Sequence, residues 1–164
     1  MIDPIQNGES GASVRSKLNG AIGRSFLGFI NVRDVSGTDV TVINDNEFTD
    51  LNYSPEVKFV QNGLELNGTE VENSGAEKNV LMLGKIDLTS GANNQIEIGF
   101  AKNGEIVPCS VVRITTPTGG RSESVAFFCT EALQTGDKLK IQVRNVNNTT
   151  NITTNVVNFI IQEI

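Results

Sequence analysis

Apolar and polar positions alternate in two runs of the chain, residues 95–102 and residues 139–144. A period of two is typical of antiparallel strands that bury one face and expose the other. We expect these runs to be the outer strands of an antiparallel meander, with residues 106–128 as the strand between them. The apolar residues at alternate positions are Ile96, Ile98, Phe100, Leu139, Ile141 and Val143.

Turn-forming residues separate the strands of this meander. Asn103-Gly104 predicts a tight two-residue hairpin, because a type I′ turn needs positive φ at both central residues. The other two turns are expected at residues 118–120 and at Gly136-Asp137.

The remainder of the chain from residue 25 repeats this strand-and-turn pattern. Turn signals recur roughly every ten residues with no helical periodicity between them, which predicts an all-β antiparallel jelly-roll sandwich over residues 25–164. The last strand, within residues 151–164, has apolar residues on both faces. We therefore expect it in the interior of a sheet or at a subunit interface.

Residues 1–24 form a different kind of element, a lead-in followed by a short amphipathic helix. Apolar residues recur there at four-residue steps, as on one face of a helix. Such a short helix is marginal alone and must pack on something. It lies on its own domain, anchors the chain to a larger assembly, or lies at a trimer axis. Net charge favours the anchor, since this segment is +1 and the remainder −7 in a chain of net −6. The expected anchor residues are Val14, Arg15, Lys17, Leu18 and Ile22.

Composition excludes several classes of function. The chain has no His, which removes the commonest general base and the usual zinc ligand, so we expect no catalytic residues, no metal and no cofactor. The acidic balance, with no basic stripe, argues against nucleic-acid binding. No apolar run approaches the ~18 residues that a membrane-spanning helix needs, and the start of the sequence lacks a secretory signal pattern.

The two cysteines, Cys109 and Cys129, each lie ten residues from Gly119. In a regular hairpin they would face each other across two strands. The first interpretation is a pair of reduced, buried thiols. The alternative is a cross-strand disulfide, which requires an oxidising environment after assembly.

Large apolar side chains on opposite faces of two strands suggest a subunit contact. Phe127 is followed by Phe128, and Phe159 is followed by Ile160 and Ile161. One face of each strand can belong to the core, and we predict that the other is a trimer interface. The alternative is that both faces are buried inside one sandwich.

Several segments together resemble a known class of proteins. Residues 7–19 (NGESGASVRSKLN) resemble an element near the start of many tailed-phage virion proteins. Residues 97–104 (EIGFAKNG) with 134–144 (QTGDKLKIQVR) resemble phage trimeric jelly rolls of tumour-necrosis-factor type, and residues 39–43 and 47–51 fit the first strands of that fold. The resemblance covers nearly the whole chain. It implies a homotrimer on the virion surface, made in the host cytoplasm, and it brings no catalytic residues.

The expected function is therefore a phage virion structural protein, as a capsid decoration or head-fibre subunit. Its N-terminal segment would bind the major capsid protein or another virion protein, and the jelly roll would project. The alternative is a tail or collar fibre tip that binds host surface glycans through residues 116–122 and 145–151. A free secreted cytokine-like ligand is disfavoured because the start lacks a secretory signal.

Overall fold

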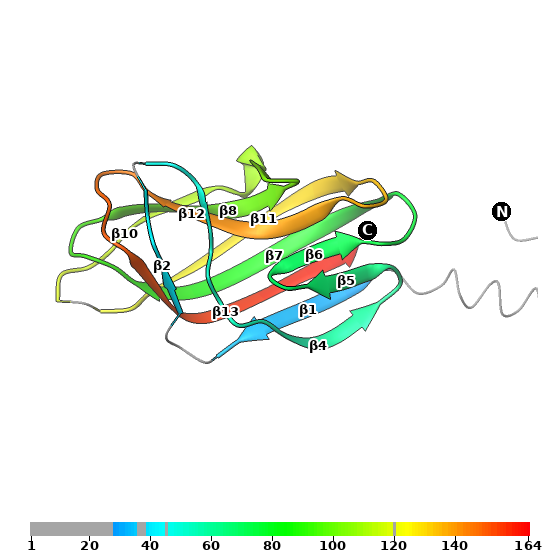
Figure 1. The fold of residues 1–164 in the computed structure, drawn as a ribbon, viewed down its shortest axis with the longest axis horizontal. Helices are drawn as coiled ribbons and strands as arrows, with labels where there is room; N and C mark the ends of the chain where they lie inside the picture. The colour runs from blue at the N-terminus through cyan, green and yellow to red at the C-terminus, as the bar shows by residue number, and fades with distance from the viewer. Residues whose placement is uncertain (1–27, 36–38, 45, 120) are drawn as a thin grey trace, which may run out of the picture.

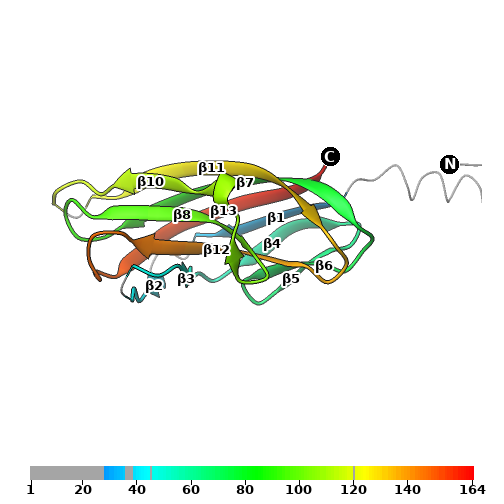
Figure 2. The same ribbon diagram turned by 90° about the horizontal axis from the view of Figure 1, so that it is seen from above.

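The computed structural model describes residues 28–35, 39–44, 46–119 and 121–164, which form two antiparallel sheets packed face to face (Figures 1 and 2). Sheet A has the strand order β11(Glu123–Leu133)-β7(Lys78–Thr89)-β13(Ile152–Glu163)-β1(Phe29–Asp34)-β4(Glu56–Gln61), with β2(Asp39–Thr41) paired to β13. Sheet B has the order β10(Val112–Thr115)-β8(Gln95–Lys102)-β12(Lys138–Asn145)-β6(Glu70–Asn73)-β5(Leu64–Asn67), with β3(Thr49–Asp50) on β12 and β9(Glu105–Ile106) on β8.

This arrangement confirms the predicted all-β jelly-roll sandwich. The predicted N-terminal helix, the anchor residues within it and the boundary at residues 24 and 25 lie outside the described residues. In the part of the chain that the structure describes, no helix is long and apolar enough to cross a membrane.

The core between the sheets is built on aromatic rings. The ring centroids of Phe100 and Phe127 are 4.9 Å apart, and those of Phe100 and Phe159 are 6.2 Å apart. Gly84 pairs with both Phe127 and Phe159, and a Cβ at this glycine would lie 2.5 Å from the Phe127 ring. The absence of a side chain at Gly84 therefore makes room for the Phe127 ring in the core.

The last strand lies where its sequence predicts. β13 is an interior strand of sheet A, between β7 and β1, and it pairs with both along most of its length. Its β-branched and aromatic residues alternate between the buried core and the outer face of the sheet.

The predicted meander is correct at its first turn. Asn103 and Gly104 have φ values of 53° and 88°, and they join β8 to β9 with Ala101 opposite Ile106. A type I′ hairpin explains both positive values.

The predicted middle strand, residues 106–128, is wrong. This segment forms β9 and β10 of sheet B, with the 3₁₀ turn η1 (Pro108–Ser110) between them, and it then crosses to sheet A as β11. Pro108 has no amide hydrogen for a strand ladder, which ends the short β9 pairing. The turn around Gly119 joins two sheets instead of closing a hairpin, and β8 and β12 are direct neighbours.

The sandwich has two distinct ends (Figure 1). The start of β1 and the end of β13 lie together at one end, where the Gly28 and Glu163 backbones are linked by a hydrogen bond of 2.7 Å from Glu163 N to Gly28 O. The β7–β8, β10–β11 and β12–β13 connections lie at the opposite end.

Candidate functional site

A row of apolar side chains crosses the outer face of sheet A. Neighbouring strands bring together Phe128, Leu83, Ile160, Asn31 and Phe59, each opposite the next, and we call these five residues the apolar row. The exposed fractions are 69% for Phe128, 50% for Phe59 and 40% for Leu83. Only Asn31 within this row is polar.

The apolar surface is wider than this row. Two residues further along their strands, Phe29 and Leu81 lie on the same face as the apolar row. The Phe29 and Phe59 rings meet edge to face at a centroid distance of 5.5 Å. Val57 and Val60 of β4 are also exposed, but they pair with the core residues Val32 and Ile30 and lie on the other side of this edge strand. A contiguous apolar surface of this kind is typical of a protein interaction site.

The predicted trimer-interface residues divide between two environments. Phe128 and Ile160 lie in the apolar row, whereas Phe127, Phe159 and Ile161 point into the core and are at most 4% exposed. Strand alternation produces this division, since successive side chains point to opposite faces. Only Phe128 and Ile160 are therefore accessible to a partner.

Polar residues border the apolar row on the side away from Phe29 and Leu81, two residues further along each strand. Lys85, Asn158 and Arg33 lie opposite one another there, and Lys85 Nζ is 3.8 Å from Asp87 Oδ1. Within the described residues, the buried oxygens Asp87 Oδ1 and Asn158 Oδ1 have no hydrogen-bond partner. The border therefore offers charged side chains to a molecule that covers the row.

The outer face of sheet B is charged, and several of its charges are paired. Glu97 of β8 lies between Arg113 of β10 and Arg144 of β12, with Nε–O distances of 2.9 Å and 2.6 Å. Burial would raise the pKa of Glu97, but the hydrogen bonds and charges of the two arginines together lower it below its usual value. Arg144 also lies over the Phe48 ring, 4.6 Å from its centroid.

A second cluster on this face surrounds Lys140. Its Nζ is 2.6 Å from Asp50 Oδ2 and 3.4 Å from Glu70 Oε1. The hydrogen bond to Asp50 is the main reason that the pKa of Lys140 is raised. Gln142 donates to the other Asp50 oxygen at 2.8 Å. These acidic residues are therefore occupied by neighbouring side chains.

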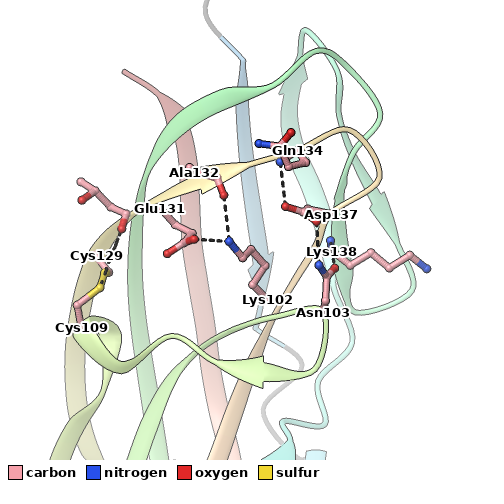
Figure 3. A network of polar contacts seen from close by, with 10 residues as sticks. Lys102, Asn103, Cys109, Cys129, Glu131, Ala132, Gln134, Asp137 and Lys138 are labelled. Carbon is pink, nitrogen blue, oxygen red and sulfur yellow. Dashed lines mark hydrogen bonds and ion pairs between the residues drawn. A yellow bond between two sulfur atoms is a disulfide. The ribbon is translucent and has the colours of Figure 1, made fainter.

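Asn103 and Asp137, from the segments 97–104 and 134–144, lie side by side (Figure 3). Asn103 Nδ2 donates to Asp137 Oδ1 at 2.8 Å, and Asn103 Oδ1 accepts from the Lys138 amide at 2.9 Å. Asp137 also accepts from the Gln134 amide, and these contacts, with that of Asn103 the largest, lower the pKa of Asp137. Asn103 and Asp137 thus join the β8–β9 and β11–β12 turns and have a structural role.

Cys109 and Cys129 form a disulfide, so the interpretation of two reduced thiols is wrong (Figure 3). Its geometry also differs from the predicted cross-strand pair. Cys109 lies on η1, beside sheet B, and Cys129 lies on β11 of sheet A, with a Cα–Cα distance of 5.8 Å. The bond therefore connects the η1 segment to the other sheet.

The two loops predicted to bind glycans begin at the same end of the sandwich. Their amide side chains are used within the protein. Asn147 Oδ1 accepts from the Gln95 amide at 2.9 Å, and Asn147 Nδ2 donates to Asn93 O at 3.2 Å. Asn148 bonds to Asn94 and accepts from the Thr150 amide. These contacts build a rigid loop platform and leave fewer amides for a sugar.

Within the described residues, no group of three or more Cys, Asp or Glu side chains is arranged to hold a metal ion. The sequence predicted two members of the apolar row, Phe128 and Ile160, but it did not predict the row itself, because the five residues come from five strands. Phe59 of β4 was missed, although the apolar residues near it in the sequence gave a signal.

Comparison with known proteins supports the fold. No protein-family model and no curated protein sequence matches the chain. The crystal structure of murine APRIL at pH 5.0 is similar with a TM-score of 0.57 and 14% identity, covering 82% of this chain and 98% of that chain. Murine APRIL at pH 8.5 gives a TM-score of 0.50 and 11% identity over 85% of this chain and 100% of that chain. The similarity establishes a jelly roll of tumour-necrosis-factor type.

Proposed function

We propose that this protein is a non-enzymatic structural subunit of a tailed-phage particle, a capsid decoration or head-fibre protein that assembles as a homotrimer through sheet A. The observation that carries the assembly is the apolar row. The virion surface as its location is supported by the resemblance of residues 7–19, 97–104 and 134–144 to phage proteins.

Large apolar side chains exposed on the outer face of sheet A favour assembly. Burying one Phe, Leu or Ile side chain contributes about 1.5–3 kcal/mol. The row offers Phe128, Leu83, Ile160 and Phe59 to a partner. Because ordering the partners opposes association, several such residues must be buried together. A closed ring of three copies can bury one such face per copy.

The position of the first described residue supports the anchor. Gly28 lies at the end of the sandwich that also holds the end of β13, opposite the β7–β8 and β12–β13 connections. An N-terminal segment bound to the shell would therefore leave the loop end free. Many copies on one particle would let weak individual contacts give firm attachment.

Sedimentation velocity tests the assembly. We expect a trimer at micromolar concentration, because the exposed row is unfavourable in water. A stable, compact single subunit at that concentration would contradict the assembly.

Truncation tests the anchor. Deletion of residues 1–22 is expected to leave a folded trimer that no longer binds its particle. A full-length Leu18→Asp variant provides the matched case, since it changes one apolar residue of the anchor. Decoration of particles by the truncated protein would rule the anchor out.

The second candidate function is a fibre tip that binds host surface glycans. It is favoured by one observation, that both predicted loops begin at the end of the molecule remote from Gly28. Copy number per particle separates the two functions, since decoration requires many copies and a fibre tip few. Binding of the trimer to host cells, lost on treatment with glycosidases, would support the fibre tip.

A further inference from the structure

We propose that the Cys109–Cys129 bond is a thiol–disulfide exchange site for low-molecular-weight thiols and disulfides, with Cys109 as the sulfur that they attack. The two half-cystines differ in access. Cys109 lies on η1 and is exposed, whereas Cys129 on β11 is 6% exposed. Exchange requires a thiolate to reach a sulfur atom, so the exposed sulfur determines the order of events.

The fold holds η1 in place independently of the disulfide. Ser110 Oγ accepts from the Phe100 amide at 2.8 Å and donates to Val107 O at 2.7 Å. The Val107 amide donates to Phe100 O at 2.8 Å. At Gly99 of β8, a Cβ would lie 2.9 Å from Ser110 Oγ, so the glycine permits this close approach. Cys109 should therefore stay beside β11 when the bond is open.

The site also has a polar group suited to the open form. Thr130 O is 3.3 Å from Cys129 Sγ and 4.0 Å from Cys109 Sγ. After reduction each sulfur carries a proton, and this carbonyl can accept it from a thiol. The open form therefore has a hydrogen-bond acceptor close to both sulfurs.

Closure takes place in two exchange steps. The Cys109 thiolate attacks one sulfur of a small disulfide such as glutathione disulfide, forms a mixed disulfide at Cys109 and releases one glutathione thiolate. The Cys129 thiolate then attacks Cys109 Sγ and releases the second. Two protein thiols are oxidised, one glutathione disulfide is reduced to two thiols, and the two protein protons pass to them. Opening is the reverse, with Cys129 as the leaving group.

This device is independent of the proposed virion role. A chain synthesised in a reducing compartment can fold with the bond open, and it can close the bond later in an oxidising one. Closure then links sheet A to the segment that covers sheet B without refolding of either sheet.

The experiment compares two single-cysteine variants of the full chain after incubation with glutathione disulfide. In Cys129→Ser the exposed Cys109 remains, and intact-mass analysis should show one glutathione adduct. In Cys109→Ser the buried Cys129 should react at least about tenfold more slowly under native conditions, and at a similar rate in denaturant. Equal native rates would overturn the assignment.

The reduced wild-type chain provides a second measurement that does not depend on the folding of either variant. A brief pulse of a thiol-alkylating reagent, followed by peptide mapping, should label Cys109 before Cys129. Labelling of Cys129 first, or of both together, would refute Cys109 as the entry sulfur.

Discussion

The outer faces of the two sheets differ in what they expose to water. On sheet B, the chain covers its own strand: η1 lies against Gly99, and Glu97 is 6% exposed between two arginines. On sheet A, the apolar row lies open, with Phe128 69% exposed. One face is therefore complete within a single subunit, whereas the other is suited to a partner.

The cause of the difference lies in the connection after β8. This connection turns back through β9 and η1 over the outer side of β8 before it reaches β10. β7, its counterpart in sheet A, lies between β11 and β13, and Leu83 on its outer face is 40% exposed. Changes on the two faces should therefore have different consequences, association on sheet A and subunit stability on sheet B.

The largest expected effect comes from a charge in the apolar row. Phe128→Asp should convert the proposed trimer to monomers at micromolar concentration, because association would bury an unpaired carboxylate. We expect a loss of about 3 kcal/mol or more in association free energy, a factor of more than 100 in the dissociation constant. Sedimentation velocity measures the change.

A control variant carries the same substitution to aspartate at a position outside the apolar row. Val42→Asp introduces the same charge at a residue that is 61% exposed, and it should leave the trimer intact. A trimer in both variants would show that the apolar row is not part of the interface. Monomers in both would show that any added negative charge dissociates the trimer.

The next effect concerns the covered face of sheet B. Gly99→Ala places a methyl group 2.9 Å from Ser110 Oγ and 3.1 Å from Val111 Cγ2, so η1 must shift outward. We expect a loss of about 2 kcal/mol in the free energy of unfolding, typical of overpacking, with the oligomeric state retained. Urea denaturation measures the loss.

A double variant tests the cause of this loss. Ser110→Ala removes the oxygen that the new methyl group meets, although it also breaks the bonds of Ser110 to β8. The two substitutions should then cost less together than the sum of their separate costs. Strict additivity would show that the contact with Ser110 is not the source.

Local patterns in the sequence predicted the local structure well. The Asn103-Gly104 hairpin forms because both residues adopt positive φ, and period-two alternation correctly identified β8 and β12. The pairing of strands was harder. The turn around Gly119 has the composition of a hairpin turn, but composition does not reveal that β10 and β11 join different sheets.

Predictions about faces failed where distant segments cover them. Alternation assigned Glu97, Gly99 and Ala101 to a solvent-exposed face, yet all three are buried. η1 and the arginines of neighbouring strands, which alternation cannot see, bury that face. Similarly, equal spacing from Gly119 predicted that Cys109 and Cys129 face each other across two strands. The two residues are close, but for a different reason, since Cys109 lies in η1 and not in a strand.

A smaller effect is expected from the charge cluster of sheet B. Glu97→Gln leaves Arg113 and Arg144 side by side without their shared carboxylate. Because both arginines retain access to water, we expect a loss of about 1–2 kcal/mol in the free energy of unfolding. Glu105→Gln, an exposed position on β9, serves as the control and should change stability by less than about 0.5 kcal/mol. Equal stability of both variants would mean that the cluster is not stabilising.

The smallest expected effect is the pH dependence of this cluster. The pKa of Glu97 is lower in the folded protein than its ordinary value of about 4.3, so its stabilisation is present above that pH and is lost as pH falls through the folded pKa. The stability difference between wild type and Glu97→Gln should therefore shrink below about pH 4, as measured by urea denaturation at a series of pH values. The apolar row contains no titratable residue, so acid should unfold the subunits without first separating them. A difference that stays constant down to acid pH, or trimers that dissociate while their subunits remain folded, would show that the two faces do not differ in the way proposed.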